Sequence, residues 1–250
     1  TKNDLVVLEL SSWQLQGFGW KKISPHIAVF TNIFPDHLNS YKSMREYIND
    51  KKLIFQNQKK SDYCLINAEN NYTKKISSEI KSKTINFHKK DVPASWKLKV
   101  DGAHNLENLS AALAVGKILG FTKKHMRDSI EAFSGIEHRL EKVGTVNDIK
   151  FINDTTSTTP IAGKMALNSV EPPVILLAGG ATKNLNLTEF ARTIVKKVKV
   201  VVLLEGSATD ELEKKIIKYG GKNIIAGRYN DFKKAIEHAY SLSLPGDTIL

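Results

Sequence analysis

Residues 149–180 read IKFINDTTSTTPIAGKMALNSVEPPVILLAGG, and this stretch decides the fold class. An apolar run ends in a loop of hydroxyl side chains, an amphipathic segment follows from Pro160, and a second apolar run begins at Val174. Proline suits the first turn of a helix because the N–H that it lacks would have no helical partner there. Two apolar strands joined by a helix predict a parallel sheet covered by helices, so the fold class is α/β.

The same alternation extends along the chain in both directions. Apolar runs predict strands at residues 5–10, 27–31, 63–67, 149–153, 174–178, 200–205 and 248–250. Amphipathic stretches predict helices at residues 43–57, 105–119, 125–133, 160–169, 188–197, 210–219 and 231–241. Asn147 and Asp148 predict the turn of a hairpin between two extended runs.

The hairpin marks the entrance to a second domain, and we place the boundary near Gly135. A central domain then occupies residues 1–134, and a smaller Rossmann-like C-terminal domain occupies residues 135–250. Thr1 leads almost at once into a strand, and Leu250 lies inside an apolar run. Because a strand at a chain end leaves backbone groups unpaired, we expect both domains to be incomplete and the chain to belong to a longer protein.

Composition excludes several classes of protein. The 250 residues are 41% hydrophobic and 25% charged, as in ordinary folded domains. No apolar run approaches the ~18 residues of a membrane span, and no signal peptide opens the chain, so we expect a cytoplasmic protein without a membrane partner. The single cysteine, Cys64, excludes an internal disulfide and a cysteine-based zinc site. Any metal site must therefore use oxygen and nitrogen ligands.

The net charge of +11 does not indicate nucleic-acid binding. Only five of the 37 basic residues are arginine, the lysines are spread along the chain, and aromatic residues make up 8%. Nucleic-acid sites instead gather arginine, lysine and aromatic side chains on one face. We expect no nucleic-acid partner, although the positive field favours anionic small molecules.

Polar residues follow the predicted strands of the central domain. Glu9, Ser11 and Ser12 follow the first strand, where they could bind a hard cation or, alternatively, cap a helix at Ser12. His37 follows the second strand, and we expect Glu9 to be its neighbour across the sheet. Lys51 lies on the next predicted helix, where an unmodified ammonium cannot ligate a metal.

Further polar groups follow farther along the chain. Asn105 and Asn108, at the start of a predicted helix, could cap it or contact a purine edge. The hydroxyl-rich residues 154–159 precede the helix at 160, where free N–H and O–H groups favour an anion. The phosphate-loop pattern G-x-x-x-x-G-K-[ST] and the pattern G-x-G-x-x-G are both absent from this chain.

Taken together, the motifs of this chain resemble the Mur ligase family, and most closely its glutamate-adding branch. The matches follow the family's order: Glu9-Leu-Ser-Ser-Trp-Gln-Leu, Asn32-x-x-Pro-Asp-His-Leu, Lys51-x-x-Ile-Phe-x-Asn-Gln, His104-Asn-x-x-Asn-x-x-Ala-Ala, Gly135-x-x-His-Arg-x-Glu, Asn153-Asp-Thr-Thr-Ser-Thr-Thr-Pro and Gly179-Gly-x-x-Lys. The first domain then corresponds to the family's ATP-binding central domain without its phosphate loop.

The resemblance implies an ATP-dependent amide-bond ligase of peptidoglycan precursor synthesis. Its substrates would be UDP-N-acetylmuramoyl-L-alanine and glutamate, with D-glutamate favoured, and the reaction would pass through an acyl phosphate. The family pattern also implies two Mg²⁺ ions and a CO₂-derived carbamate on Lys51. Such a carbamate would replace the ammonium by an oxygen donor.

The resemblance assigns the site residues as follows. Metal binding and catalysis are implied for Glu9, His37 and carbamylated Lys51; nucleotide binding for Asn105, Asn108, Arg139 and Asp154; and substrate binding for Ser11, Ser12, Thr158 and Lys183. Many glutamate-adding members have Ser-Lys where this chain has Thr155-Thr156, which leaves the enantiomer of glutamate open.

Two other hypotheses remain from the sequence. The chain could belong to another member of the superfamily, such as a folylpolyglutamate synthetase, or it could be a noncatalytic nucleotide-binding remnant. We expect a monomer, and we expect residues 1–250 alone to be inactive because the phosphate loop is missing.

Overall fold

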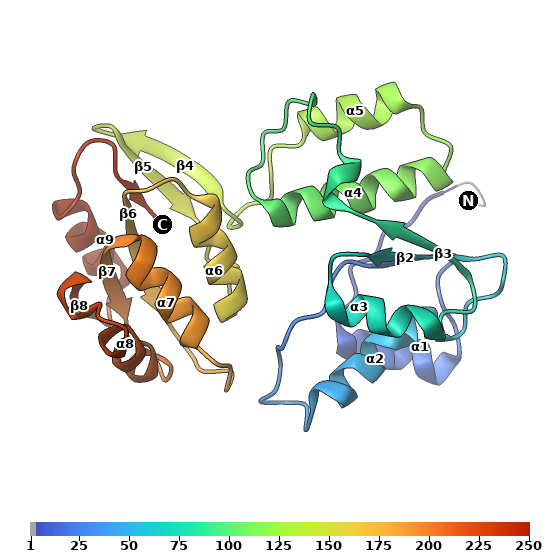
Figure 1. Cartoon of the computed structure of the whole chain (residues 1–250), viewed down its shortest axis with the longest axis horizontal. Coiled ribbons are helices and arrows are strands. Elements are labelled where there is room, and N and C mark those ends of the chain that lie inside the picture. Colours follow the sequence, from blue (N-terminus) through green and yellow to red (C-terminus); the bar gives the residue numbers. More distant parts are fainter. Residues whose placement is uncertain (1–3) are drawn as a thin grey trace. The chain divides into compact units, whose positions relative to one another are not determined.

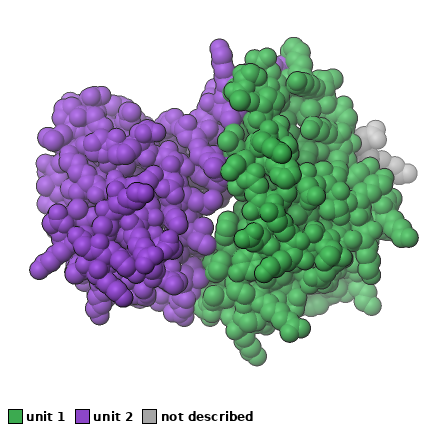
Figure 2. Space-filling model, viewed as in Figure 1, with its two compact units in different colours: residues 1–96, 106–127 green, residues 97–105, 128–250 purple. Residues whose placement is uncertain are grey.

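The computed structural model describes residues 4–250 and divides the chain into two compact units. Unit 1 contains residues 1–96 and 106–127, and unit 2 contains residues 97–105 and 128–250 (Figure 2). Helices α4 (Ala103–Ile118) and α5 (Lys123–Ala132) contribute residues to both units. The domain boundary that the sequence places near Gly135 stays a prediction.

Unit 1 is built on a parallel sheet of three strands in the order β1-β2-β3. Strands β2 and β3 of this sheet lie side by side in Figure 1. Its elements in chain order are α1 (Ser12–Lys21), β1 (Ile27–Phe30), α2 (Met44–Gln56), β2 (Tyr63–Asn67), α3 (Asn71–Ile76), β3 (Lys83–Phe87) and part of α4, with short 3-10 turns at Ser77–Glu79 and Lys89–Asp91. Successive side chains of a strand point to opposite faces. Helices pack against the side chains on both faces of this sheet.

The two faces of this sheet bury different side chains. Leu65 and Phe87 pack with Ala111 of α4 on one face. On the other face, Phe30 and Ile66 belong to a cluster with residues of α2 and α3. Cys64 lies in the second cluster and is fully buried, and burial raises the pKa of its thiol to about 12. It is a small apolar core residue rather than a reactive thiol.

The strand predicted at residues 5–10 is wrong for the described part of the chain. These residues form no strand, and Val7 is 94% exposed. An apolar run becomes a strand only when a neighbouring strand accepts its backbone hydrogen bonds, and no described strand does so here. The expectation that Glu9 is the sheet neighbour of the His37 loop is wrong for the same reason.

Unit 2 contains a six-stranded sheet in the order β4-β5-β9-β6-β7-β8. Only the hairpin of β4 and β5 is antiparallel, and the other pairs are parallel. The elements of unit 2 are β4 (Glu141–Val146), β5 (Ile149–Asn153), α6 (Pro160–Ser169), β6 (Val174–Gly179), α7 (Thr188–Lys197), β7 (Val198–Leu204), α8 (Thr209–Lys218), a 3-10 turn (Lys222–Ile224), β8 (Ile225–Tyr229), α9 (Phe232–Ser241) and β9 (Thr248–Ile249).

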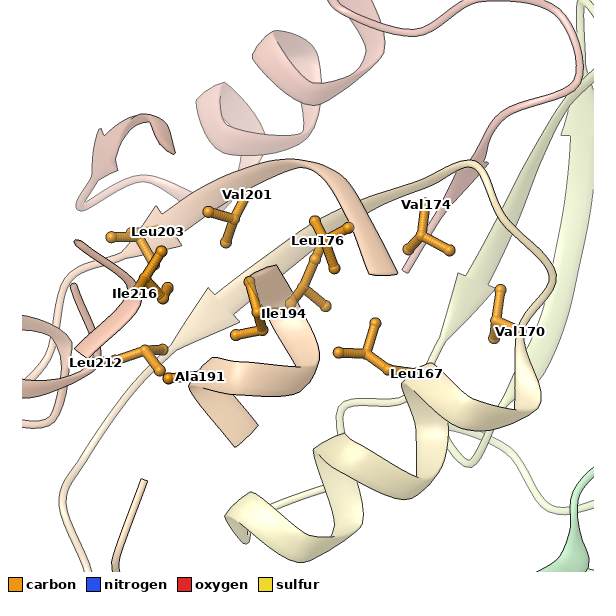
Figure 3. Close-up of a cluster of buried hydrophobic side chains, with 11 residues drawn as sticks. Leu167, Val170, Val174, Leu176, Ala191, Ile194, Val201, Leu203, Leu212 and Ile216 are labelled. Carbon is orange, nitrogen blue, oxygen red and sulfur yellow. The ribbon is translucent and has the colours of Figure 1, made fainter. Parts of the chain in front are cut away.

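Helices cover both faces of the unit 2 sheet. Figure 3 shows the larger cluster, in which side chains of β6 and β7 meet Leu167 of α6, Ile194 of α7 and Ile216 of α8. On the opposite face, Ala235 and Ala239 of α9 pack against the sheet. This arrangement confirms the α/β fold class and the doubly wound second half of the chain.

Most predicted elements occur within two residues of their expected bounds. Asn147 and Asp148 have φ values of 49° and 62°, so they form the expected left-handed hairpin turn between β4 and β5. Helix α1 corresponds to the helix that the capping alternative at Ser12 predicts. Helix α3 and strands β3 and β8 were not predicted, because their sequences are only five or six residues long. Among the described residues, no helix is both long enough and apolar enough to cross a membrane.

The packing of α8 gives a matched test of the core of unit 2. Ile216 is fully buried, whereas its neighbour Ile217 is 43% exposed. We expect Ile216→Ala to lower the free energy of unfolding of unit 2 by about 2–5 kcal/mol, because it leaves a cavity in the core. Ile217→Ala should change it by only about 0.5 kcal/mol. Hydrogen exchange of the backbone amides of β6 and β7 measures the free energy of unfolding of both variants. Equal losses of stability in Ile216→Ala and Ile217→Ala would contradict this packing.

Candidate active site

The loop after β1 holds His37 in a defined position. His37 has a left-handed backbone with φ of 57°, and its N–H donates to the Asp36 carboxylate at 2.7 Å. The imidazole Nε2 lies 3.4 Å from the other oxygen of the same carboxylate. The indole of Trp13 meets the imidazole edge-on, with 4.6 Å between ring centroids. Asp36 and Trp13 therefore fix the ring of His37.

Tyr47 connects His37 to Lys51. Its ring centroid lies 5.9 Å from the imidazole centroid, and the Lys51 ammonium lies 5.0 Å from that same tyrosine centroid. Tyr47 and Lys51 are one helical turn apart on α2, which places their side chains on one face of the helix. The same tyrosine ring thus contacts two of the three residues predicted to serve the metal.

Burial changes the acid–base behaviour of both residues on α2. Desolvation lowers the pKa of the half-buried Lys51 ammonium, and the nearby Asp36 carboxylate opposes part of that shift. Burial, with help from Asp36, raises the pKa of Tyr47 to about 12. A lysine with a lowered pKa is more often in the neutral amine form, which is the nucleophilic form.

Glu9, Ser11 and Ser12 lie at the start of α1. Glu9 is exposed. Ser11, rather than the predicted Ser12, caps the helix: its hydroxyl accepts from the Gln14 N–H at 3.3 Å, and its own N–H donates to the Gln14 side chain at 2.8 Å. Ser12 is buried and faces the hydroxyl of Tyr41. Capping of α1 therefore accounts for Ser11 but not for Ser12.

The described part of the chain contains no preformed metal site made of carboxylate and histidine side chains. Within residues 4–250, no three His, Cys, Asp or Glu side chains lie close enough together to hold a metal ion. Mg²⁺, however, commonly uses one or two protein oxygens together with waters and substrate phosphates. The pair of His37 and Lys51 fits such a cation only if the lysine nitrogen is converted into an oxygen donor.

A pocket in unit 2 contains two of the predicted nucleotide-binding residues. It has a volume of about 320 Å³, and its lining includes Asn105 and Arg139 with the apolar residues Val100, Ile152 and Val170. The Asn105 side chain donates to the Asp101 carbonyl at 2.7 Å at the start of α4. Asn108 lies three residues farther along α4 and is exposed. Nine of the fifteen lining residues are polar or charged, so the pocket is largely polar.

The loop after β5 is held by hydrogen bonds to the segment before β4. The Asp154 carboxylate accepts from the Leu140 N–H at 3.0 Å and from the Ser157 hydroxyl. The Thr156 N–H and hydroxyl both donate to the His138 carbonyl, at 3.1 and 2.8 Å. Thr159 caps α6 through the Ala162 N–H. Capping therefore uses one hydroxyl and leaves the others to organise the loop.

Thr158 and Lys183 come together although they are 25 residues apart in the sequence. The Lys183 ammonium donates to the Thr158 hydroxyl at 3.1 Å. Thr158 follows β5 and Lys183 follows β6, so both lie at the edge where the parallel strands end. An ammonium beside a hydroxyl can bind a carboxylate by charge and hydrogen bonding.

Two features of the site were not predicted from the sequence. Trp13 and Tyr47 contact His37 and Lys51, and the four-residue spacing between Tyr47 and Lys51 was the available signal. Ser207, after β7, accepts a hydrogen bond from the Thr182 N–H at 3.0 Å. No spacing in the sequence indicates that contact, because the two residues follow different strands.

Comparison with protein families identifies the class of protein. Residues 1–96 match the Mur ligase middle domain, and residues 138–250 match the Mur ligase, glutamate ligase domain. Together the two matches cover most of the chain. The chain belongs to the Mur ligase family.

Curated relatives align along nearly the whole chain. It is 32% identical to the UDP-N-acetylmuramoylalanine–D-glutamate ligase of Roseiflexus sp. (strain RS-1), an alignment that covers 98% of this chain and 59% of the relative. It is also 32% identical to the enzyme of that name from Pediococcus pentosaceus, with 100% of this chain and 58% of the relative covered. The chain thus spans less than two thirds of these relatives.

Solved structures share the fold at lower identity. The MurF ligase of Thermotoga maritima in complex with ADP matches with a TM-score of 0.72 and 16% identity, over 96% of this chain and 61% of that one. Mycobacterium tuberculosis folylpolyglutamate synthase complexed with ADP matches with a TM-score of 0.71 and 16% identity, over 90% and 60% of the two chains. These similarities establish the fold.

The lowered pKa of Lys51 predicts a pH-dependent stability of unit 1. Between the folded pKa and the ordinary lysine pKa, the unfolded chain binds more protons, so stability should rise with pH through that window by at most about 1.4 kcal/mol per pH unit. Below the folded pKa both states are protonated, and above the ordinary lysine pKa both are neutral, so stability does not change with pH through Lys51 outside this window. Urea unfolding from pH 8 to 10.5, followed by tryptophan fluorescence, tests this because all three tryptophans lie in unit 1.

Lys51→Met should remove this rise. Lys60→Met, at an exposed position, is the control and should keep it. An identical pH dependence in the wild-type chain and in Lys51→Met would show that Lys51 is not desolvated.

Proposed function

We propose that the protein containing this chain adds D-glutamate to UDP-N-acetylmuramoyl-L-alanine in an ATP-dependent reaction of peptidoglycan precursor synthesis. The observation that carries this proposal is the 32% identity to D-glutamate ligases along 98% of the chain. The name of those relatives also favours D-glutamate over L-glutamate. We place the reaction in the cytoplasm and expect a monomer.

The geometry of unit 2 supports a role in binding the amino acid. Glutamate carries two carboxylates, and the pair of Lys183 and Thr158 offers a cation and a hydroxyl 3.1 Å apart. In this proposal the pair binds a glutamate carboxylate and thereby orients the amine for attack. Thr155 and Thr156 add no positive charge to this edge of the sheet.

The nucleotide would bind through residues that the structure places on α4 and in unit 2. Asn105 and Arg139 line the same pocket, so we assign them to the base and phosphate ends of ATP. Asp154 is assigned to the ribose hydroxyls, because a carboxylate accepts two hydrogen bonds from neighbouring hydroxyls. Asn108 is assigned to the base with Asn105, one helical turn away. ADP in two solved structures of this fold supports a nucleotide site.

Lys51 would act as a carbamate. The neutral amine attacks CO₂, a C–N bond forms, and the nitrogen loses one proton to solvent, which leaves a carboxylate-like group on the side chain. The lowered pKa of Lys51 favours the neutral amine that this step needs. His37, which contacts the same Tyr47 ring, would complete the donor pair, and Glu9 with Ser11 and Ser12 would serve the phosphate and substrate side. When bound, Mg²⁺ would neutralise negative charge on the ATP phosphates and on the acyl phosphate.

The proposed reaction forms one amide bond for each ATP. The substrate carboxylate attacks the γ-phosphorus and displaces ADP, which gives an acyl phosphate. The glutamate amine then attacks the acyl carbon to give a tetrahedral intermediate, which loses phosphate as the amine loses a proton. The chain's residues contribute by holding the carboxylate of glutamate and the nucleotide in reacting positions.

The alternative of a folylpolyglutamate synthetase receives less support. Such an enzyme also adds glutamate, so the glutamate ligase domain fits both functions. Identity nevertheless reaches 32% with the D-glutamate ligases of peptidoglycan synthesis and only 16% with the solved folylpolyglutamate synthase. The muramoyl substrate is therefore the better candidate.

A phosphate-release assay tests the proposed function. We expect ATP to be consumed only when UDP-N-acetylmuramoyl-L-alanine and glutamate are both present, with D-glutamate preferred over L-glutamate. The assay uses the protein in its natural length beside the 250-residue chain, which we expect to have negligible activity because it lacks a phosphate-loop motif. Release with another amino acid, but with neither enantiomer of glutamate, would reject the proposal. No release under any condition would favour a noncatalytic remnant.

Substitution of Lys51 tests the carbamate. Lys51→Ala should lower turnover by at least about a hundredfold, because it removes the proposed oxygen donor. A short-chain carboxylate supplied in solution should restore part of the activity. Lys52→Ala on the same helix is the control; it removes an ion pair with Glu79, at 2.6 Å, and should leave turnover nearly unchanged. Equal turnover of Lys51→Ala and the wild-type protein would show that Lys51 has no role in the reaction, and would reject the carbamate.

A further inference from the structure

The loop between β7 and α8 lies directly against the loop that carries Lys183. Gly179 at the end of β6 pairs with Leu204 at the end of β7, so the two strands finish side by side. The Ala208 N–H donates to the Gly180 carbonyl at 3.0 Å. The Thr182 N–H donates to the Ser207 hydroxyl, also at 3.0 Å. The two loops are therefore joined by two hydrogen bonds, one of them immediately before Lys183.

The approach of these loops is too close for side chains at the contact. A Cβ atom at Gly206 would lie 2.3 Å from the Gly180 carbonyl oxygen, and a Cβ atom at Gly179 would lie 2.0 Å from the Leu204 carbonyl oxygen. Only glycine at these positions permits the observed backbone contact. The loop that carries Lys183 thus rests on the β7–α8 loop as a support.

The β7–α8 loop is held by an ion pair at its first residue, Glu205. Arg228 on β8 forms a two-pronged ion pair with Glu205, with distances of 2.8 and 2.7 Å. The same guanidinium reaches Asp210 at 2.7 Å and Glu213 at 3.0 Å on α8. A planar guanidinium that binds three carboxylates fixes the start of the loop and the first turn of α8.

We propose that Ser207 is a positioning residue of the amino-acid site, which holds the Thr182–Lys183 backbone so that the Lys183 ammonium stays beside Thr158. The Thr182 N–H donates to the Ser207 hydroxyl. The next residue, Lys183, donates through its ammonium to the Thr158 hydroxyl. The ligand is the carboxylate of an anionic amino acid. This inference rests on the proposed function, in which Lys183 binds a carboxylate of glutamate.

Two readouts test the role of Ser207, and only one of them depends on activity. In Ser207→Ala the Thr182 amide loses its acceptor, so its hydrogen exchange should become about fivefold faster. In the active protein the same substitution should raise KM for glutamate about fivefold and leave KM for ATP and kcat nearly unchanged. Ser207→Thr keeps the hydroxyl and should restore both values. Ser241→Ala, which removes a hydroxyl that donates to the His238 carbonyl of α9, is the matched control.

Each outcome decides a separate question. Unchanged exchange at Thr182 in Ser207→Ala would overturn the positioning role, whatever the activity of the protein. Faster exchange with an unchanged KM for glutamate, or a raised KM for ATP, would overturn the link from Ser207 to the amino-acid site. A protein that shows faster exchange in the variant but never uses glutamate, even as wild type, would instead reject the proposed function.

Discussion

The parallel register of β5, β6 and β7 fixes where unit 2 presents its polar groups. Parallel strands end at the same edge of a sheet, and the loops after these three strands carry Asp154 to Thr159, Lys183 and Ser207. The hydrogen bonds from Lys183 to Thr158 and from Thr182 to Ser207 cross between these loops. Without the strand register, side chains so far apart in sequence would have no reason to meet.

That register depends in turn on the packing of apolar side chains on both faces of the sheet. Residues of α6, α7 and α8 cover one face, and α9 covers the other. Gly179 and Gly206 then allow the ends of β6 and β7 to come into backbone contact. In unit 1 an aromatic residue has a comparable role, because the ring of Tyr47 contacts both His37 and Lys51.

Much of this architecture could be predicted from local sequence patterns. Pro160 and Thr159 mark the start of α6, and Asn147 with Asp148 marks the β4–β5 turn, because these residue types favour those backbone conformations directly. The failure at residues 5–10 has the opposite cause. An apolar run has strand propensity, but a strand forms only when another strand pairs with it, and pairing is not a local property.

The sequence alone determined the fold class, the succession of strands and helices in unit 2, and the motifs that resemble the Mur ligase family. These depend on residue type and spacing, which are visible in one dimension. The tertiary structure decided which polar groups meet: Lys183 with Thr158, Ser207 with Thr182, and Tyr47 with both His37 and Lys51. It also decided that Lys51 is half-buried with a lowered pKa, because desolvation depends on every segment that packs around the side chain.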